Sequence, residues 1–109
     1  MAGVSSLRDA AHMIDRDRIA ADWAARGFSC DLWIDPPGQR WEDFTHATDE
    51  LVVVLEGEME FEVRGQVRHP QPGEELLIPV GAVHSARNVG SVTARWLYGY
   101  HSVTASPKA

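Results

Sequence analysis

The chain has 109 residues, which is enough for one compact domain with a single core and too few for two. Its formal net charge is −6, and its ten Lys and Arg form no cluster, which argues against a nucleic-acid partner. The only cysteine, Cys30, rules out an internal disulfide, and no apolar run is long enough to cross a membrane, so we expect a cytoplasmic protein.

The first predicted element is an amphipathic helix over residues 15–26, DRDRIAADWAAR. Aspartates gather at its start and an arginine at its end, where each sign of charge suits the helix dipole, and Gly27 follows as a stop signal. The apolar stripe on one face consists of Ile14, Ile19 and Trp23. A small domain would leave such a stripe uncovered, so we expect the chain to form a homodimer.

After the helix the pattern changes to short alternating segments separated by turn residues. Short strands at this spacing are typical of an antiparallel sandwich or barrel. We therefore expect a helical extension over residues 1–27, a β-domain over residues 28–102 and a flexible tail over residues 103–109. The main turn residues are Gly38, Gly57, Gly73, Pro79 and Gly81.

Two adjacent segments predict strands of different kinds. Residues 51–55, LVVVL, are apolar on both faces, which predicts a central strand that is covered on both sides. Residues 56–65, EGEMEFEVRG, alternate between apolar and acidic side chains. We expect the acidic face, with Glu58, Glu60 and Glu62, to be a solvated surface that aids solubility or guards a sheet edge, with a specific cation site as the alternative.

The segment FTHATDELVVVLEG, residues 44–57, places His46 four residues before Glu50 at the start of the apolar strand. Burying a carboxylate without a partner costs roughly several kcal/mol. A metal ion is one candidate for the compensating charge.

The segment GEELLIPVGAVHSARN, residues 73–88, predicts a strand, a Pro-x-Gly turn and a second strand. On that second strand His84 and Asn88 share one face, while Arg87 faces outward. A histidine inside a barrel must form hydrogen bonds or coordinate a metal. Asn88 either lines the same pocket or satisfies backbone groups in a turn.

These two segments resemble the paired motifs of a small cupin of the jelly-roll, or double-stranded β-helix, type. The residues that fit the second motif are Gly73, Pro79, Gly81, His84 and Asn88, and those that fit the first are Gly38, His46, Glu50 and Gly57. One position departs from the first motif, because Phe44 stands where its first histidine is expected. The resemblance spans residues 28–101 and implies an all-β fold with the helix outside it.

The resemblance also implies a divalent transition metal, such as iron, manganese, nickel or zinc, held by His46, Glu50 and His84. Two imidazoles and one carboxylate form the ligand set of a facial triad, which leaves coordination positions open. Phe44 would replace the missing ligand with an aromatic wall of the pocket. Glu42, one step further along the same face, is either a substitute oxygen ligand in the pocket or an exposed strand end. The alternative is a metal-free pocket in which Glu50 hydrogen-bonds a histidine.

The last predicted strand lies within TARWLYGYHS, residues 93–102. Its alternation puts Trp96 and Tyr98 on one face and Arg95 and His101 on the other, without showing which face points inward. We expect Trp96 and Tyr98 to line the pocket, with core packing as the alternative for Trp96. His101 is a weaker candidate for a replacement ligand.

Two functions agree with the resemblance, because cupins host enzymes as well as binding proteins. The first is a metal-dependent enzyme of oxygenase, isomerase or lyase type that acts on a small organic acid or aromatic compound. The second is a non-catalytic cupin that binds or senses a small ligand. A fused DNA-binding module would favour a sensor, and the single helix over residues 15–26 is not one, so we favour the enzyme.

Overall fold

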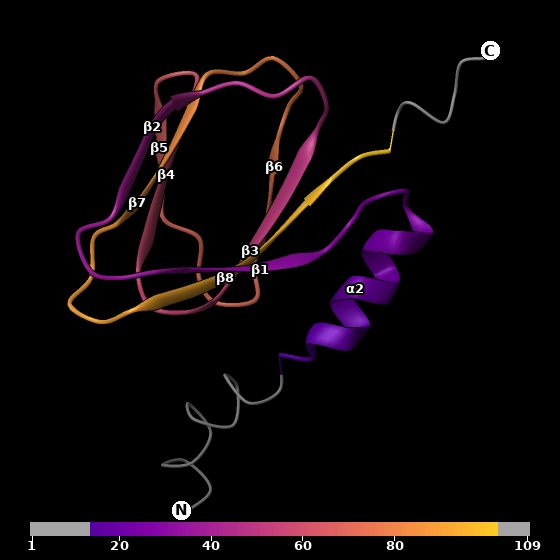
Figure 1. Cartoon of the computed structure of the whole chain (residues 1–109), viewed down its shortest axis with the longest axis horizontal. Coiled ribbons are helices and arrows are strands. Elements are labelled where there is room, and N and C mark those ends of the chain that lie inside the picture. Colours follow the sequence, from indigo (N-terminus) through magenta and orange to yellow (C-terminus); the bar gives the residue numbers. More distant parts are fainter. Residues whose placement is uncertain (1–13, 103–109) are drawn as a thin grey trace, which may run out of the picture.

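The computed structural model describes residues 14–102, which form two four-stranded antiparallel sheets and a helix (Figure 1). The elements are α2 (Arg16–Ala25), β1 (Asp31–Asp35), β2 (Arg40–Phe44), β3 (Glu50–Glu56), β4 (Met59–Val63), β5 (Gln66–Arg68), β6 (Glu75–Ile78), β7 (His84–Asn88) and β8 (Ala94–Tyr100). The strand order is β1-β8-β3-β6 in one sheet and β2-β7-β4-β5 in the other. The two sheets face each other as in a jelly roll, which confirms the predicted fold class.

Helix α2 is one residue shorter at each end than the predicted range 15–26 and packs outside the barrel (Figure 1). The side chain of Asp15 caps its first turn by accepting a hydrogen bond of 3.1 Å from the backbone N–H of Arg18. Gly27 follows the helix with φ of 90°. Trp23 is only 1% exposed, because it packs against the outer faces of β3 and β8. Trp23 of the apolar stripe is therefore buried within the chain, whereas Ile14 and Ile19 are only partly buried and line an open hollow. The homodimer stays a prediction.

Strand β3 is buried on both faces, as predicted. Val52 and Val54 point into the barrel and join the inner core. Leu51 and Val53 point outward and pack with Trp23 of the helix. One strand thus separates two apolar clusters, which explains why its sequence shows no alternation.

The acidic face of β4 corrects the sequence prediction. Strand β4 is an inner strand between β7 and β5, so it guards no edge. Arg87 faces outward, as expected, but its side chain is only 12% exposed. Its guanidinium binds Glu60 at 2.7 Å, Glu62 at 2.8 Å and Glu42 at 2.9 Å. Glu60 and Glu62, together with Glu42 of β2, therefore form an ion-pair network around one arginine, whereas Glu58 is exposed and lies outside it.

The predicted turn glycines lie where the chain needs positive φ, with Gly57 as the clearest case. Gly57 has φ of 91°, and an added Cβ would lie 2.7 Å from the Cα of Ala94. The other three, at Gly38, Gly73 and Gly81, also have positive φ.

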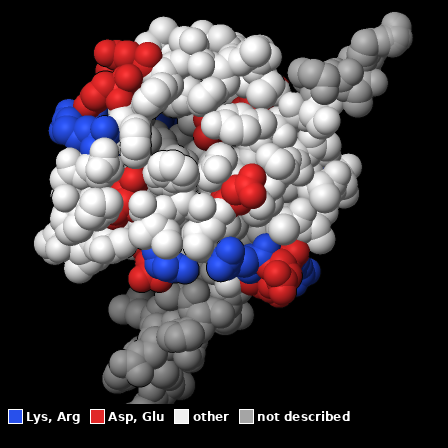
Figure 2. Space-filling model, viewed as in Figure 1, with Lys and Arg blue, Asp and Glu red and all other residues white. Residues whose placement is uncertain are grey.

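Several sequence expectations concern features outside the barrel. Residues 1–13 of the expected extension and the expected tail over residues 103–109 lie outside the described part of the chain. Within that part, no helix is long and apolar enough to cross a membrane. On the face shown in Figure 2, the described basic side chains lie beside acidic ones and form no continuous basic surface.

Candidate metal site

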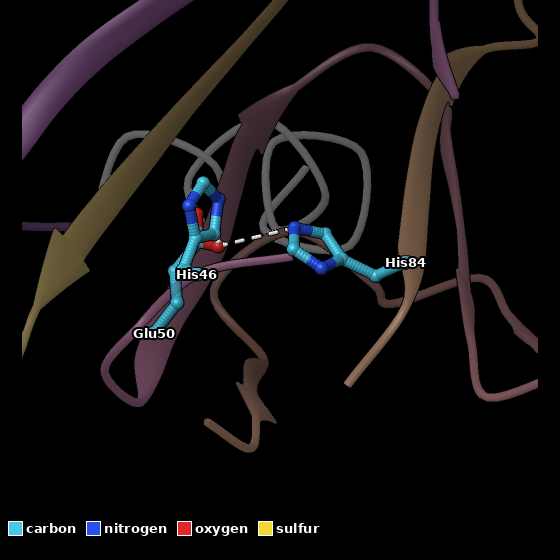
Figure 3. A group of neighbouring side chains, drawn as sticks. All are labelled: His46, Glu50 and His84. Carbon is cyan, nitrogen blue, oxygen red and sulfur yellow. Dashed lines mark ion pairs between the residues drawn. The ribbon is translucent and has the colours of Figure 1, made fainter. Parts of the chain in front are cut away.

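The three ligand candidates named from the sequence meet inside the barrel (Figure 3). His46 comes from the loop before β3, Glu50 is the first residue of β3, and His84 is the first residue of β7 in the opposite sheet. One ligand atom from each lies within 4.8 Å of the others. The Nε2 atoms of both histidines lie 3.5 Å from Oε1 of Glu50.

The carboxylate of Glu50 has an unsatisfied oxygen. Its side chain is 5% exposed, and Oε1 accepts no hydrogen bond from any described residue. The two imidazole nitrogens at 3.5 Å are too distant for strong hydrogen bonds. An unpaired buried carboxylate oxygen is costly, and a divalent cation between it and the two nitrogens would compensate for that cost. The donor set therefore fits a transition metal.

The tautomer of His84 is fixed by the backbone. Its Nδ1 lies 3.0 Å from the carbonyl oxygen of Ala82, and since a carbonyl only accepts, Nδ1 carries the hydrogen. Nε2 then presents its lone pair toward Glu50, as a metal ligand must. Burial alone lowers the pKa of His84, but Glu50 and the Ala82 carbonyl outweigh it, so the net pKa is raised. The surroundings of His84 therefore favour a positive charge at this position.

Tyr100 is a pocket residue that sequence reasoning did not single out. Its hydroxyl lies 3.4 Å from Nε2 of His46, and the two ring centroids are 4.9 Å apart. Burial, together with the nearby charge of Glu50, raises the pKa of Tyr100 to about 12. The hydroxyl is therefore protonated at neutral pH and can donate a hydrogen bond.

The ligand candidates lie in a cavity of about 230 Å³. Its lining is mostly aromatic, and the ionisable groups in it are the three ligand candidates and two tyrosines. The lining residues are Trp33, Trp41, Phe44, His46, Glu50, Phe61, Ile78, His84, Trp96, Tyr98 and Tyr100. A larger open hollow of about 1140 Å³ lies beside α2, but its described lining contains no histidine. We therefore place the site in the smaller cavity.

A β-bulge decides which residues of β2 reach the cavity. Trp41 pairs with Ala86 and Phe44 with His84, so the strand contains one extra residue between them. The extra residue is Asp43, which has φ of 58°. Trp41 and Phe44 are three residues apart and still both line the cavity.

The same bulge decides between the two roles expected for Glu42, in favour of the exposed one. In a regular strand Glu42 would share a face with Phe44, but the extra residue turns it to the outer face. There its carboxylate pairs with Arg87 at 2.9 Å and with Arg40 at 2.8 Å. Glu42 is therefore not a candidate ligand.

Asn88 also lies outside the cavity. Its side-chain NH₂ donates to the carbonyl oxygens of Asp35 at 3.1 Å and Val92 at 2.9 Å. Its Oδ1 accepts a hydrogen bond of 2.9 Å from the backbone N–H of Gly90. Asn88 thus satisfies backbone groups at the end of β7, the second of the two roles expected for it.

The inward face of β8 is the one with the aromatic side chains. Trp96 and Tyr98 line the cavity, as expected, whereas Leu97 points outward to the helix cluster. Arg95 lies near Glu56 on the surface. The ring of His101 packs against Phe28 with centroids 4.9 Å apart, so it is not a replacement ligand.

Asp35 has a buried carboxylate that was not predicted from the sequence. It accepts hydrogen bonds from the indoles of Trp33, Trp41 and Trp96. A signal existed, because the chain contains four tryptophans and a buried indole N–H needs an acceptor. The alternation of β1 alone could not identify which acid supplies it.

Comparisons with known proteins agree with this geometry. A family model for the cupin domain matches residues 31–100. The chain is 34% identical over 78 residues to polyketide synthase CurC from Streptomyces cyaneus, and the match covers 71% of this chain. It covers 49% of CurC, so the chain spans about half the length of that curated relative.

Two solved structures illustrate the similarity of fold. The cupin domain of Cnp3 from Schizosaccharomyces pombe has a TM-score of 0.67 at 19% identity, with 75% of this chain and 61% of that chain covered. Oxalate oxidase in complex with the substrate analogue glycolate has a TM-score of 0.63 at 26% identity, with 71% and 43% covered.

Proposed function

The chain belongs to the cupin family, and from this premise we propose that it is a metal-dependent enzyme acting on a small, largely apolar organic molecule. The observation that carries the proposal is the buried Oε1 of Glu50, which has no hydrogen-bond partner among the described residues and lies 3.5 Å from two imidazole nitrogens. The described cavity lining contains no Lys or Arg that would pair with this carboxylate. A bound cation would complete the site.

The residues that would hold the ion are His46, Glu50 and His84. When bound, a divalent transition metal supplies Lewis acidity and open coordination positions. In the neutral ring of His84, the hydrogen bond to the Ala82 carbonyl keeps the hydrogen on Nδ1 and leaves Nε2 free to bind a metal. Glu50 offers the negative charge that a cation needs. Phe44 occupies the position of a fourth family ligand with a group that cannot coordinate, so it narrows the cavity without filling the ligand set.

The remaining lining would select and orient the substrate. Its aromatic side chains exclude water and favour a flat apolar molecule. The protonated hydroxyl of Tyr100, beside His46, can donate a hydrogen bond to an oxygen of that molecule. Such a donor would hold one end of the substrate near the ligand cluster.

The names of the relatives suggest two substrate classes. Oxalate oxidase is named for a small dicarboxylate, whereas polyketide synthase CurC is named for polyketides. The proposed metal ion would bind one carboxylate of a dicarboxylate, but the described lining of this cavity includes no Lys or Arg to pair with the second. We therefore favour a polyketide-type or related aromatic compound.

Metal analysis tests the proposal. The full chain, purified without a metal-chelating column, would be analysed for bound metals by mass spectrometry and titrated with Zn²⁺, Mn²⁺, Ni²⁺ and Fe²⁺. We expect about one ion per chain, and a loss of affinity of at least about tenfold in Glu50→Gln and His84→Ala.

The matched control is His69→Ala, because His69 is exposed and pairs with Glu60 on the outer surface. It should bind metal as the wild type does. A wild-type chain that stays folded but takes up no divalent ion after reconstitution would refute the proposed function.

A further inference from the structure

Asp35, at the end of β1, is a buried acid with an unusual set of partners. It is 1% exposed, and its carboxylate accepts three indole N–H groups. Trp33 and Trp41 each donate to Oδ1 at 2.9 Å, and Trp96 donates to Oδ2 at 3.0 Å. Three hydrogen bonds to the ionised carboxylate provide what a buried charge requires.

The three tryptophans come from different parts of the fold. Trp33 and Trp96 lie on β1 and β8 of one sheet, and Trp41 lies on β2 of the other. All three line the cavity, whereas Asp35 does not. The carboxylate therefore lies behind these three aromatic side chains, which form one wall of the cavity. Its hydrogen bonds connect the two sheets on that side of the cavity.

Packing alone does not hold this wall in place. Trp33 is 38% exposed, so packing covers only part of its side chain and restricts its rotamer less than full burial would. Its neighbours meet it edge to face, with centroid distances of 5.7 Å to Trp41 and 6.0 Å to Tyr98. A directional hydrogen bond to a charged acceptor fixes the orientation that these contacts leave free.

We propose that Asp35 is a positioning residue that fixes the three indole rings and thereby sets the shape of the cavity for a flat, ring-containing ligand. The inference rests on the proposed function only in taking this cavity as the substrate site. Asp35 acts through the tryptophans, since it is not itself part of the cavity lining.

The four indole N–H signals in a ¹H–¹⁵N NMR spectrum provide a direct readout. The fourth, from Trp23, is an internal reference, because this indole donates to Glu75 at 3.0 Å on the other side of β3. In Asp35→Asn, one acceptor oxygen and the charge are lost. We expect the signals of Trp33, Trp41 and Trp96 to shift and to exchange with solvent at least about tenfold faster, while the Trp23 signal stays in place.

Ligand binding is measured with 2-naphthol, a flat molecule of two fused rings, in the presence of EDTA. We expect Asp35→Asn to weaken 2-naphthol binding about tenfold. The metal stoichiometry of the same variant, measured without EDTA, should equal that of the wild type. The control is Asp31→Asn, on the exposed part of β1. This variant should change neither the affinity for 2-naphthol nor the metal stoichiometry.

Trp33→Phe keeps an aromatic ring at a half-exposed position but removes one of the three donors. If Asp35→Asn fails to fold, Trp33→Phe still tests the proposal. We expect about threefold weaker 2-naphthol binding and shifted signals for Trp41 and Trp96. Unchanged 2-naphthol binding in the folded variants, or shifts spread equally over all four indoles, would overturn the proposal. Because the 2-naphthol measurement uses EDTA, a failure of metal binding would leave its result intact.

Discussion

Phe44 and His84 face each other across the ladder between β2 and β7, with ring centroids 6.4 Å apart. A histidine in place of Phe44 would therefore present a third imidazole to the ligand cluster. We expect Phe44→His to bind a divalent metal at least about tenfold more tightly than the wild type, as measured by calorimetry. The added ligand should also lower 2-naphthol binding to the metal-loaded chain, because it occupies space on the open side of the site.

Phe44→Leu is the control, because it stays apolar and supplies no donor; its metal affinity should match the wild type. If Phe44→His leaves metal affinity unchanged, Phe44 does not reach the ion. If only Phe44→His binds metal, the wild-type site has lost its function.

The stability of the metal-free fold and the strength of metal binding should change with pH in opposite directions. The pKa of His84 is raised above its ordinary value of 6.5, since Glu50 and the Ala82 carbonyl outweigh the effect of burial. The pair of His84 and Glu50 therefore stabilises the metal-free fold below pH 6.5, and this contribution is lost as pH rises through the folded pKa. Metal binding needs neutral imidazoles, so it strengthens over the same range.

Thermal unfolding between pH 5 and 8, with and without Zn²⁺, measures this difference. We expect the rise in Tm caused by Zn²⁺ to grow with pH. In Glu50→Gln the metal-free Tm should vary less over this range. A zinc effect that is constant with pH would contradict the assignment of both histidines as ligands.

The network around Arg87 should set the acid stability of the barrel. The hydrogen bond from Arg87 lowers the pKa of Glu42 to about 2 and also lowers the pKa of Glu60. A depressed carboxyl pKa contributes stability above the unfolded value of about 4.3, and that contribution is lost as pH falls toward 2. In urea unfolding, Glu42→Gln should be less stable than the wild type at pH 6, and the difference should vanish near pH 2.

Glu58→Gln is a suitable comparison, because Glu58 is an exposed acid outside this network. Its difference from the wild type should be small at both pH values. An equal difference for the two variants at pH 6 would show that the network adds nothing to stability.

Removing Trp23 should loosen the helix without altering the metal site. The side chain is 1% exposed and fills the outer cluster against Leu51, Val53 and Leu97. We expect Trp23→Ala to lower the free energy of unfolding by about 3–5 kcal/mol, measured with urea. Ala24→Ser, on the exposed side of α2, should cost less than about 1 kcal/mol. Metal content per folded chain should be equal in both variants, and a loss in Trp23→Ala would contradict the separation of the two clusters.

Sequence alone predicted the parts of this protein that depend on local patterns. The two motifs indicated the barrel and brought together His46, Glu50 and His84, and the unbroken apolar run of β3 predicted a strand covered on both sides. These features depend on spacing along the chain, which a sequence records directly.

The features that escaped prediction depend on departures from regular geometry or on distant partners. The bulge at Asp43 shifts the inward–outward alternation of side chains in β2 by one residue. An aspartate in the sequence does not by itself indicate a positive φ, so the bulge could not be predicted. Asp35 and Trp96 are 61 positions apart, so their contact follows only from the packed fold. The inward face of β8 was equally undecided, since both of its faces are largely buried.

The candidate ligands border the inner apolar cluster, because Phe61, Ile78 and Trp96 of that cluster line the same cavity, but His46, Glu50 and His84 are not themselves part of the apolar core. In evolutionary terms, the barrel and its chemistry can diverge independently. A single codon change can add or remove a metal ligand while the core that folds the chain is inherited unaltered. Phe44, at the place of a family histidine, is an exchange of that kind. Descendants of one such barrel can therefore keep a common shape while they acquire different reactions.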